Sequence, residues 1–89
     1  MVWRIEFDEA AIKDLANLDK QLARRITIFM RERIAVLDDP RSIGQALKGS
    51  KLGEFWKYRV GDSRIIGCIE DTALRILVVK IGNRREVYR

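Results

Sequence analysis

Hydrophobic positions divide the first part of the chain into a strand and a short helix. Residues 2–7 alternate, with Trp3, Ile5 and Phe7 on one side, which is the period-two pattern of a half-buried strand. Asp8 then suits a helix N-cap. Apolar residues follow it at helical spacing: Ala11, Ile12, Leu15 and Leu18. This pattern predicts a short first helix directly after the strand.

A second apolar stripe begins after Asp19, which suits another N-cap. Its members again recur at helical spacing: Leu22, Ile26, Phe29, Met30, Ile34 and Leu37. They predict a helix of about 18 residues, roughly 27 Å long at ~1.5 Å per residue. Asp38, Asp39 and Pro40 end it, because the residue before a proline is pushed out of the helical region.

The rest of the chain predicts a loop and three strands. Residues 38–53 contain three glycines and no clear periodicity, so we expect a surface loop anchored by Leu47 and Leu52. Three segments with strand character follow the loop: 54–60, 64–70 and 74–82. The last of them is almost continuously apolar, as expected of a strand in the middle of the core.

The resulting order of elements, βααβββ, predicts an α+β fold. Two N-terminal helices would pack on one face of a four-stranded, mainly antiparallel sheet, and the other face would be open. The chain has 89 residues, of which 47% are hydrophobic, so we expect a single domain that spans residues 1–89.

Positive charge is concentrated in the second half of the chain. Residues 1–47 contain eight basic and eight acidic side chains, whereas residues 48–89 contain ten basic and five acidic ones. The net charge of +5 therefore belongs to the second half. This asymmetry indicates a polyanionic partner, although a generally solubilising positive surface explains the charge equally well.

The scarcity of cysteine and histidine argues against several kinds of site. Cys68 is the single cysteine and the sequence has no histidine, so we expect no internal disulfide, no zinc site and no cofactor. The first ten residues contain no apolar run long enough for a signal peptide or a membrane span. These features predict a cytoplasmic protein that does not bind membranes.

The segment 55–64 brings basic side chains together. Successive residues of a strand alternate faces, so Lys57 and Arg59 share one face. If residues 61–62 form a two-residue turn, Arg59 lies directly opposite Arg64. Like charges opposed across a ladder destabilise a sheet, so we expect a site for an anion such as nucleic acid. The alternative is that these cations discourage pairing between strand edges.

The second helix also carries basic residues away from its apolar stripe: Lys20, Arg24, Arg25, Arg31 and Arg33. A solvated helix face explains them, and a surface that contacts a phosphate backbone is the alternative. In the second case Arg24 and Arg31 would be RNA- or ribosome-binding residues, together with Lys48 and Lys51 of the loop.

Several short motifs occur in a defined order along the chain. They are Phe-Asp-Glu at 7–9, Pro-Arg at 40–41, Leu-Lys-Gly at 47–49, Lys-x-Arg at 57–59, Ile-Gly-x-Arg at 81–84 and Glu-Val-Tyr at 86–88. Together with the order of the elements, this set resembles the RelE/ParE superfamily of bacterial toxins, and more specifically its RelE side. The resemblance covers essentially the whole chain and implies a RelE-like fold.

The resemblance also implies a function and partners. RelE toxins of type II toxin–antitoxin systems are endoribonucleases that cut mRNA in the ribosomal A site, by attack of a ribose 2′-hydroxyl on the adjacent phosphate, and so inhibit translation. The implied partners are the ribosome with its mRNA and a cognate antitoxin that forms a heteromeric complex with the toxin. The implied catalytic residues are Lys57, Arg59, Arg64, Arg84 and Tyr88. Arg85 is an implied RNA-binding residue that could take the place of Arg84.

The acid–base properties of the implied catalytic residues indicate which role each of them can take. In-line cleavage requires a base, stabilisation of the charged transition state and an acid for the leaving oxygen. Arginine keeps its proton at neutral pH, so Arg59, Arg64 and Arg84 suit phosphate binding. Lys57 is surrounded by cations and is therefore the residue that could give up its proton as the base. Tyr88 could stack on a nucleobase or position the 2′-hydroxyl, and no residue is assigned as the acid.

Two other functions stay open. A ParE-like toxin would inhibit DNA gyrase without cutting RNA, and it would not require Lys57, Arg64, Arg84 and Tyr88 together. A basic RNA-binding module without activity would bind RNA in a salt-dependent manner and would be insensitive to the Tyr88→Phe change.

Overall fold

The structure is a computed structural model that describes residues 2–47 and 55–83. Some expectations concern residues outside these ranges: Lys48, Lys51, Leu52, Arg84, Arg85 and Tyr88. The described ranges contain two α-helices, a five-stranded sheet and the hairpin with the central basic residues. None of the helices in them is long and apolar enough to cross a membrane.

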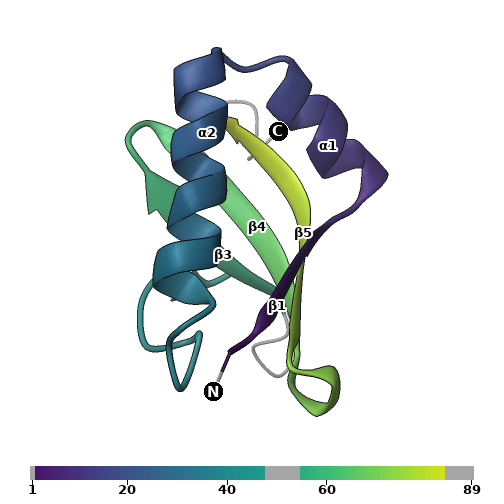
Figure 1. Cartoon of the computed structure of the whole chain (residues 1–89), viewed down its shortest axis with the longest axis vertical. Coiled ribbons are helices and arrows are strands. Elements are labelled where there is room, and N and C mark those ends of the chain that lie inside the picture. The colour runs from purple at the N-terminus through teal and green to yellow at the C-terminus, as the bar shows by residue number, and fades with distance from the viewer. Residues whose placement is uncertain (1, 48–54, 84–89) are drawn as a thin grey trace.

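Five strands form one mixed sheet in the order β1-β5-β4-β3-β2. β1 (Arg4–Phe7) pairs in parallel with β5 (Arg75–Asn83), whereas the other neighbouring strands are antiparallel. The three other strands are β2 (Gln45–Ala46), β3 (Phe55–Val60) and β4 (Ser63–Glu70). Both helices lie on the same face of the sheet (Figure 1). The α+β class and the mainly antiparallel sheet are thereby confirmed.

Both helices begin at the predicted caps. Asp8 accepts a hydrogen bond of 2.9 Å from the Ala11 amide and starts α1 (Glu9–Ala16). Asp19 accepts from two amides of the first turn and starts α2 (Lys20–Ile28). The helical path continues to residue 34, but its last six residues, Phe29–Ile34, are a π-helix.

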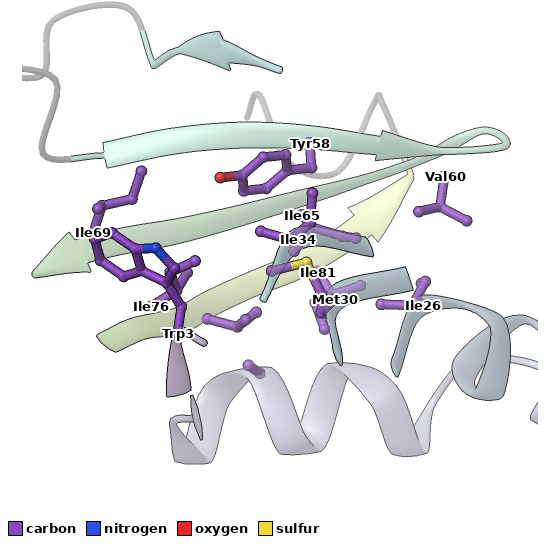
Figure 2. Close-up of a cluster of buried hydrophobic side chains, with 12 residues drawn as sticks. Trp3, Ile26, Met30, Ile34, Tyr58, Val60, Ile65, Ile69, Ile76 and Ile81 are labelled. Carbon is purple, nitrogen blue, oxygen red and sulfur yellow. The ribbon is translucent and has the colours of Figure 1, made fainter. Parts of the chain in front are cut away.

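The core lies between the helices and one face of the sheet, as Figure 2 shows. The helical layer contributes Ile26, Met30 and Ile34, all fully buried. The sheet contributes its inward-facing residues, among them Tyr58, Ile65, Ile76, Val78 and Ile81. Burial of one such side chain stabilises the fold by about 1.5–3 kcal/mol.

The expectation that Ile12 belongs to the apolar face of α1 is wrong. Ala11 is the fully buried residue of this helix, whereas 55% of the Ile12 side chain is exposed. Successive residues of an α-helix are about 100° apart. With Ala11 pointing at the sheet, Ile12 points along its surface.

The sheet has one strand more than predicted. β2 (Gln45–Ala46) forms within the segment 38–53, which the sequence analysis assigns to a loop, and it pairs with β3. The Leu47 amide extends the pairing with a hydrogen bond of 3.0 Å to the Phe55 carbonyl. Two residues are too few to show the period-two pattern from which strands are predicted. β2 therefore depends on the neighbouring edge of β3.

Candidate functional site

The β3–β4 hairpin has the predicted register. Val60 pairs with Ser63, and Arg59 pairs with Arg64 across a two-residue turn. Gly61 adopts the positive φ of 58° that such turns require. The Arg59 side chain bends back, and its Nε donates a hydrogen bond of 3.2 Å to the Gly61 carbonyl. The turn thus accommodates two opposed arginines at the end of the sheet.

Four basic residues lie in two neighbouring rows on the face of the sheet opposite the helices. In one row Ile66 of β4 pairs with Lys57 of β3 and with Lys80 of β5. In the next row Arg64 pairs with Arg59 on one side and with a glycine of β5 on the other. We call Lys57, Arg59, Arg64 and Lys80 the cationic face. Arg59 and Lys80 are exposed, and the other two are half-buried.

Lys80 was not predicted as a site residue. Strict alternation along β5 would place it with Ile76 and Val78, which face the core. In the structure Ile81 is the next core residue, so the alternation is shifted by one position. The signal that could have revealed Lys80 is the lone charge in an otherwise apolar run.

The opposite end of the same face is neutralised by ion pairs. Arg75 donates from Nε to Glu70 Oε2 at 2.7 Å and from Nη1 to Glu6 Oε1 at 3.1 Å. Arg4 Nη1 lies 3.8 Å from Glu6 Oε2. The hydrogen bond from Arg75 lowers the pKa of the Glu70 carboxyl, and the same bond raises the pKa of Arg75. These two carboxylates are therefore engaged away from the cationic face.

An apolar row separates the two charged ends. Cys68 pairs with Phe55 on β3 and with Leu77 on β5, and all three side chains are half-buried. Cys68 thus lies between two larger apolar residues and acts as a small apolar side chain. The charged side chains that β3, β4 and β5 carry on this face therefore lie at its two ends.

The other side of β3 holds the strand in place. Tyr58 is 1% exposed, its hydroxyl donates to the Pro40 carbonyl, and its ring meets the Phe29 ring edge-on at 6.3 Å. Burial raises the pKa of the Tyr58 hydroxyl. Trp56 Nε1 donates a hydrogen bond of 2.7 Å to the Ile43 carbonyl. Tyr58 is therefore a residue of the core.

The helix arginines are not part of the cationic face. Arg24 and Arg31 are exposed on the helical layer, which covers the other face of the sheet. Arg25 comes closer, because a Cβ added to Gly61 would lie 3.6 Å from Arg25 Nη1. Positive charge therefore continues from the hairpin turn towards α2 through Arg25 rather than through the two predicted residues.

The four side chains that define the cationic face are all positively charged groups. Guanidinium groups bind phosphate through paired hydrogen bonds, and lysine contributes a mobile point charge. Among residues 2–47 and 55–83 no three side chains of the metal-binding types come together. Asn83 ends β5 beside Ser63, so the described strand finishes at the same end of the sheet as Arg59 and Arg64.

Comparison with protein families gives one match. The model of the family described as ParE toxin of type II toxin-antitoxin system, parDE, matches residues 5–88. A search of curated proteins found no matching sequence.

The solved structures with a similar fold include chains of toxin–antitoxin complexes. The chain is similar to one in the RelBE2 toxin–antitoxin complex of Mycobacterium tuberculosis, with TM-score 0.81, 19% identity and coverage of 94% of this chain and 93% of that one. For a chain of the intact RelBE toxin–antitoxin complex of E. coli, the TM-score is 0.73 and the sequence identity is 22%. The match covers 91% of this chain and 95% of that one. For a chain of the archaeal RelE–RelB complex of Pyrococcus horikoshii OT3, the TM-score is 0.71 and the sequence identity is 27%. The match covers 94% of this chain and 97% of that one. The predicted RelE-like fold is confirmed.

Proposed function

We propose that this chain, which belongs to the ParE toxin family of type II toxin–antitoxin systems within the RelE/ParE superfamily, cuts mRNA on the ribosome. The observation that carries the proposal is the cationic face. It presents Lys57, Arg59 and Arg64 on the sheet face opposite the helices, and two of them are opposed in the ladder at a cost in stability. A surface for phosphate groups explains why this cost is retained.

The proposed reaction is attack of a ribose 2′-hydroxyl on the adjacent phosphate. The new bond from the 2′-oxygen to phosphorus closes a 2′,3′-cyclic phosphate, the bond from phosphorus to the 5′-oxygen of the next nucleotide breaks, and that oxygen takes a proton from water and leaves as a hydroxyl. Arg59 and Arg64 hold the phosphate oxygens and stabilise the negative charge of the transition state. Lys57 accepts the proton of the 2′-hydroxyl. The proposal extends to Arg84, which follows Asn83 directly in the chain, as a further phosphate ligand, and to Tyr88 as the residue that stacks on a base.

A cognate antitoxin is the second partner that we propose. The related RelE structures include toxin–antitoxin complexes from two bacteria and an archaeon. An antitoxin that neutralises this toxin would form a heteromeric complex with it and keep the cationic face from RNA. The ribosome remains the proposed site of action of the released toxin.

Inhibition of DNA gyrase is a second candidate function. The matched family model is that of ParE toxins, which favours this activity. A gyrase inhibitor would act through a protein contact and would not need the proton transfer assigned to Lys57. The two functions therefore differ in their sensitivity to substitution at this lysine.

The test is to add purified protein to a translating extract and to map the 5′ ends of the mRNA fragments. We expect cleavage at codon-spaced positions. Lys57→Ala and Arg64→Gln should each lower the cleavage rate at least about 100-fold, because each removes a group that acts in the transition state. Arg4→Gln is the matched control, since Arg4 lies on the same face at its neutralised end.

Intact mRNA with the wild-type protein would contradict the proposal. A supercoiling assay with purified gyrase is run in parallel. Inhibition of supercoiling that survives Lys57→Ala, without mRNA cleavage, would establish the second candidate instead.

A further inference from the structure

We propose that Lys80 is an additional RNA-binding residue, and that a β-bulge in β5 places it on the cationic face. The inference rests on the proposed function, because it concerns RNA bound at the same surface. It adds a residue that neither the motifs of the sequence nor the alternation of the strand indicates. Its basis is the register of β4 and β5 and one hydrogen bond from α1.

The bulge is visible in the pairing of the two strands. Gly67 pairs with Val78 and Ile66 pairs with Lys80, so Val79 is the extra residue of β5. A bulge changes the direction of the side chains that follow it, and bulges are common next to active sites for this reason. Here it moves Lys80 from the core side to the open side of the sheet.

Side-chain burial agrees with this register. Val78 and Ile81 are 0% and 3% exposed and both belong to the core, although they are three residues apart. Lys80 between them is exposed. Without the bulge, Lys80 would occupy a core position, and an isolated buried ammonium group carries a large desolvation cost.

A carboxylate from α1 holds the chain at this point. Asp14 Oδ2 accepts a hydrogen bond of 2.9 Å from the Ile81 amide, which belongs to the peptide unit that joins Lys80 to Ile81. β1 ends at Phe7, before this part of β5, so the amide has no strand partner on that side. The orientation of Lys80 is therefore defined by a contact outside the sheet.

Lys80 widens the cationic face by one strand. Lys57 and Lys80 flank Ile66 in the same row, about 10 Å apart at ~4.8 Å per strand. Ile66 is only 7% exposed, so the row presents two ammonium groups around an apolar centre. In the described part of the chain Lys80 forms no salt bridge. With their backbones on strands two apart, the two lysines can contact two different phosphates of one RNA strand.

The expected role is binding rather than chemistry. The ammonium of Lys80 is two strands away from that of Lys57 and contributes charge to a phosphate beside the one that is cut. Loss of Lys80 should therefore weaken RNA binding and leave the maximal cleavage rate close to that of the wild type. Loss of Lys57 or Arg64, in contrast, should lower the cleavage rate itself.

The experiment measures binding of a short, 2′-O-methylated single-stranded RNA, which the toxin cannot cut, by fluorescence anisotropy over a range of salt concentrations. Lys80→Gln should raise Kd about fivefold to tenfold, as expected for one lost charge-assisted contact. The slope of log Kd against log salt should fall by about 0.7, the value for one phosphate of a single strand. Lys80→Arg should restore both quantities.

Lys13→Gln is the matched control, because Lys13 is an exposed lysine on α1, in the layer that covers the other face of the sheet. Equal Kd values and equal slopes for Lys80→Gln and Lys13→Gln would overturn the inference, and so would a wild-type protein that does not bind the RNA.

Cleavage in the translating extract separates this inference from the proposed function. If Lys80→Gln weakens RNA binding but the wild type leaves mRNA intact, the nuclease proposal fails and the assignment of Lys80 stands. The other outcome is that the wild type cleaves mRNA and that Lys80→Gln and Lys13→Gln reach half-maximal cleavage at the same protein concentration. In that case the assignment of Lys80 fails and the nuclease proposal stands.

Discussion

Gly44 lies directly against β3 in the segment that follows the helices. Its φ is +81°, and a Cβ at this position would lie 2.5 Å from the Lys57 carbonyl oxygen and 2.8 Å from Trp56 Nε1. Real Cβ atoms do not approach other atoms so closely, and residues other than glycine rarely adopt this φ. The fit of the loop against the strand that carries Lys57 therefore depends on the absence of a side chain.

Gly44→Ala should destabilise the protein by more than about 1 kcal/mol, since it adds both backbone strain and a contact with the backbone of β3. Urea unfolding followed by tryptophan fluorescence measures the change. Gly61→Asn is the control, because Gly61 also has a positive φ but a Cβ there would meet its nearest neighbour, Arg25 Nη1, at 3.6 Å. A free energy of unfolding for Gly44→Ala equal to that of the control would refute the argument.

At the scale of elements, β5 has two halves with different neighbours. Its first half lies between β1 and β4, whereas its second half pairs with β4 and is held on the other side by Asp14 of α1. The bulge at Val79 lies where the first half passes into the second. The position of Lys80 thus depends on a helix that precedes it by more than sixty residues.

Asp14→Ala removes the acceptor of the Ile81 amide, so this amide should exchange faster with solvent. The unpaired buried donor should also cost about 1–3 kcal/mol of stability. Hydrogen exchange followed by NMR reports on this amide directly. Asp14→Asn keeps an oxygen acceptor at the same place and should retain most of the protection. Unchanged exchange in Asp14→Ala would show that the carboxylate does not anchor β5.

At the scale of the whole molecule, an ion pair joins two loops that are distant in the sequence. Arg41, in the segment after the helices, donates from Nη1 to Asp71 Oδ1 at 2.9 Å and from Nη2 to Asp71 Oδ2 at 3.0 Å. Asp71 begins the 3₁₀-helix Asp71–Ala73 between β4 and β5. The hydrogen bond from Arg41 lowers the pKa of the Asp71 carboxyl.

The lowered pKa gives the stability a defined pH dependence. A carboxyl whose pKa is lower in the folded state stabilises the protein above its unfolded pKa of ~3.9 and loses this contribution as the pH falls through the folded pKa. Asp71→Asn should therefore lower the free energy of unfolding at pH 7, by less than about 1 kcal/mol because the carboxylate is 62% exposed. The difference from the wild type should shrink below about pH 5 and vanish in strong acid.

Urea unfolding of both proteins at a series of pH values measures this difference. Asp38→Asn is the control, because Asp38 is an exposed carboxylate in the same segment as Arg41. A difference between wild type and Asp71→Asn that is constant with pH would contradict the assigned ion pair.

Local patterns in the sequence predicted much of the fold. The two helix caps, Asp8 and Asp19, and the register that opposes Arg59 to Arg64 follow from interactions within a few residues. A side chain that caps a helix meets its amides within one turn, and a two-residue turn leaves one way to pair its strands. The sequence by itself therefore determined the order of the two helices and the four longer strands, and the central part of the cationic face.

The tertiary structure decided what depends on neighbours from elsewhere in the chain. β2 exists because the edge of β3 offers hydrogen bonds, and Lys80 faces outward because a bulge shifts β5 by one residue. A shift of one residue moves every following side chain to the other face of a strand, and a mostly apolar run does not reveal it. The packing of Ile81 into the core and the carboxylate of Asp14 select the register. Neither contact is visible in the sequence around Lys80.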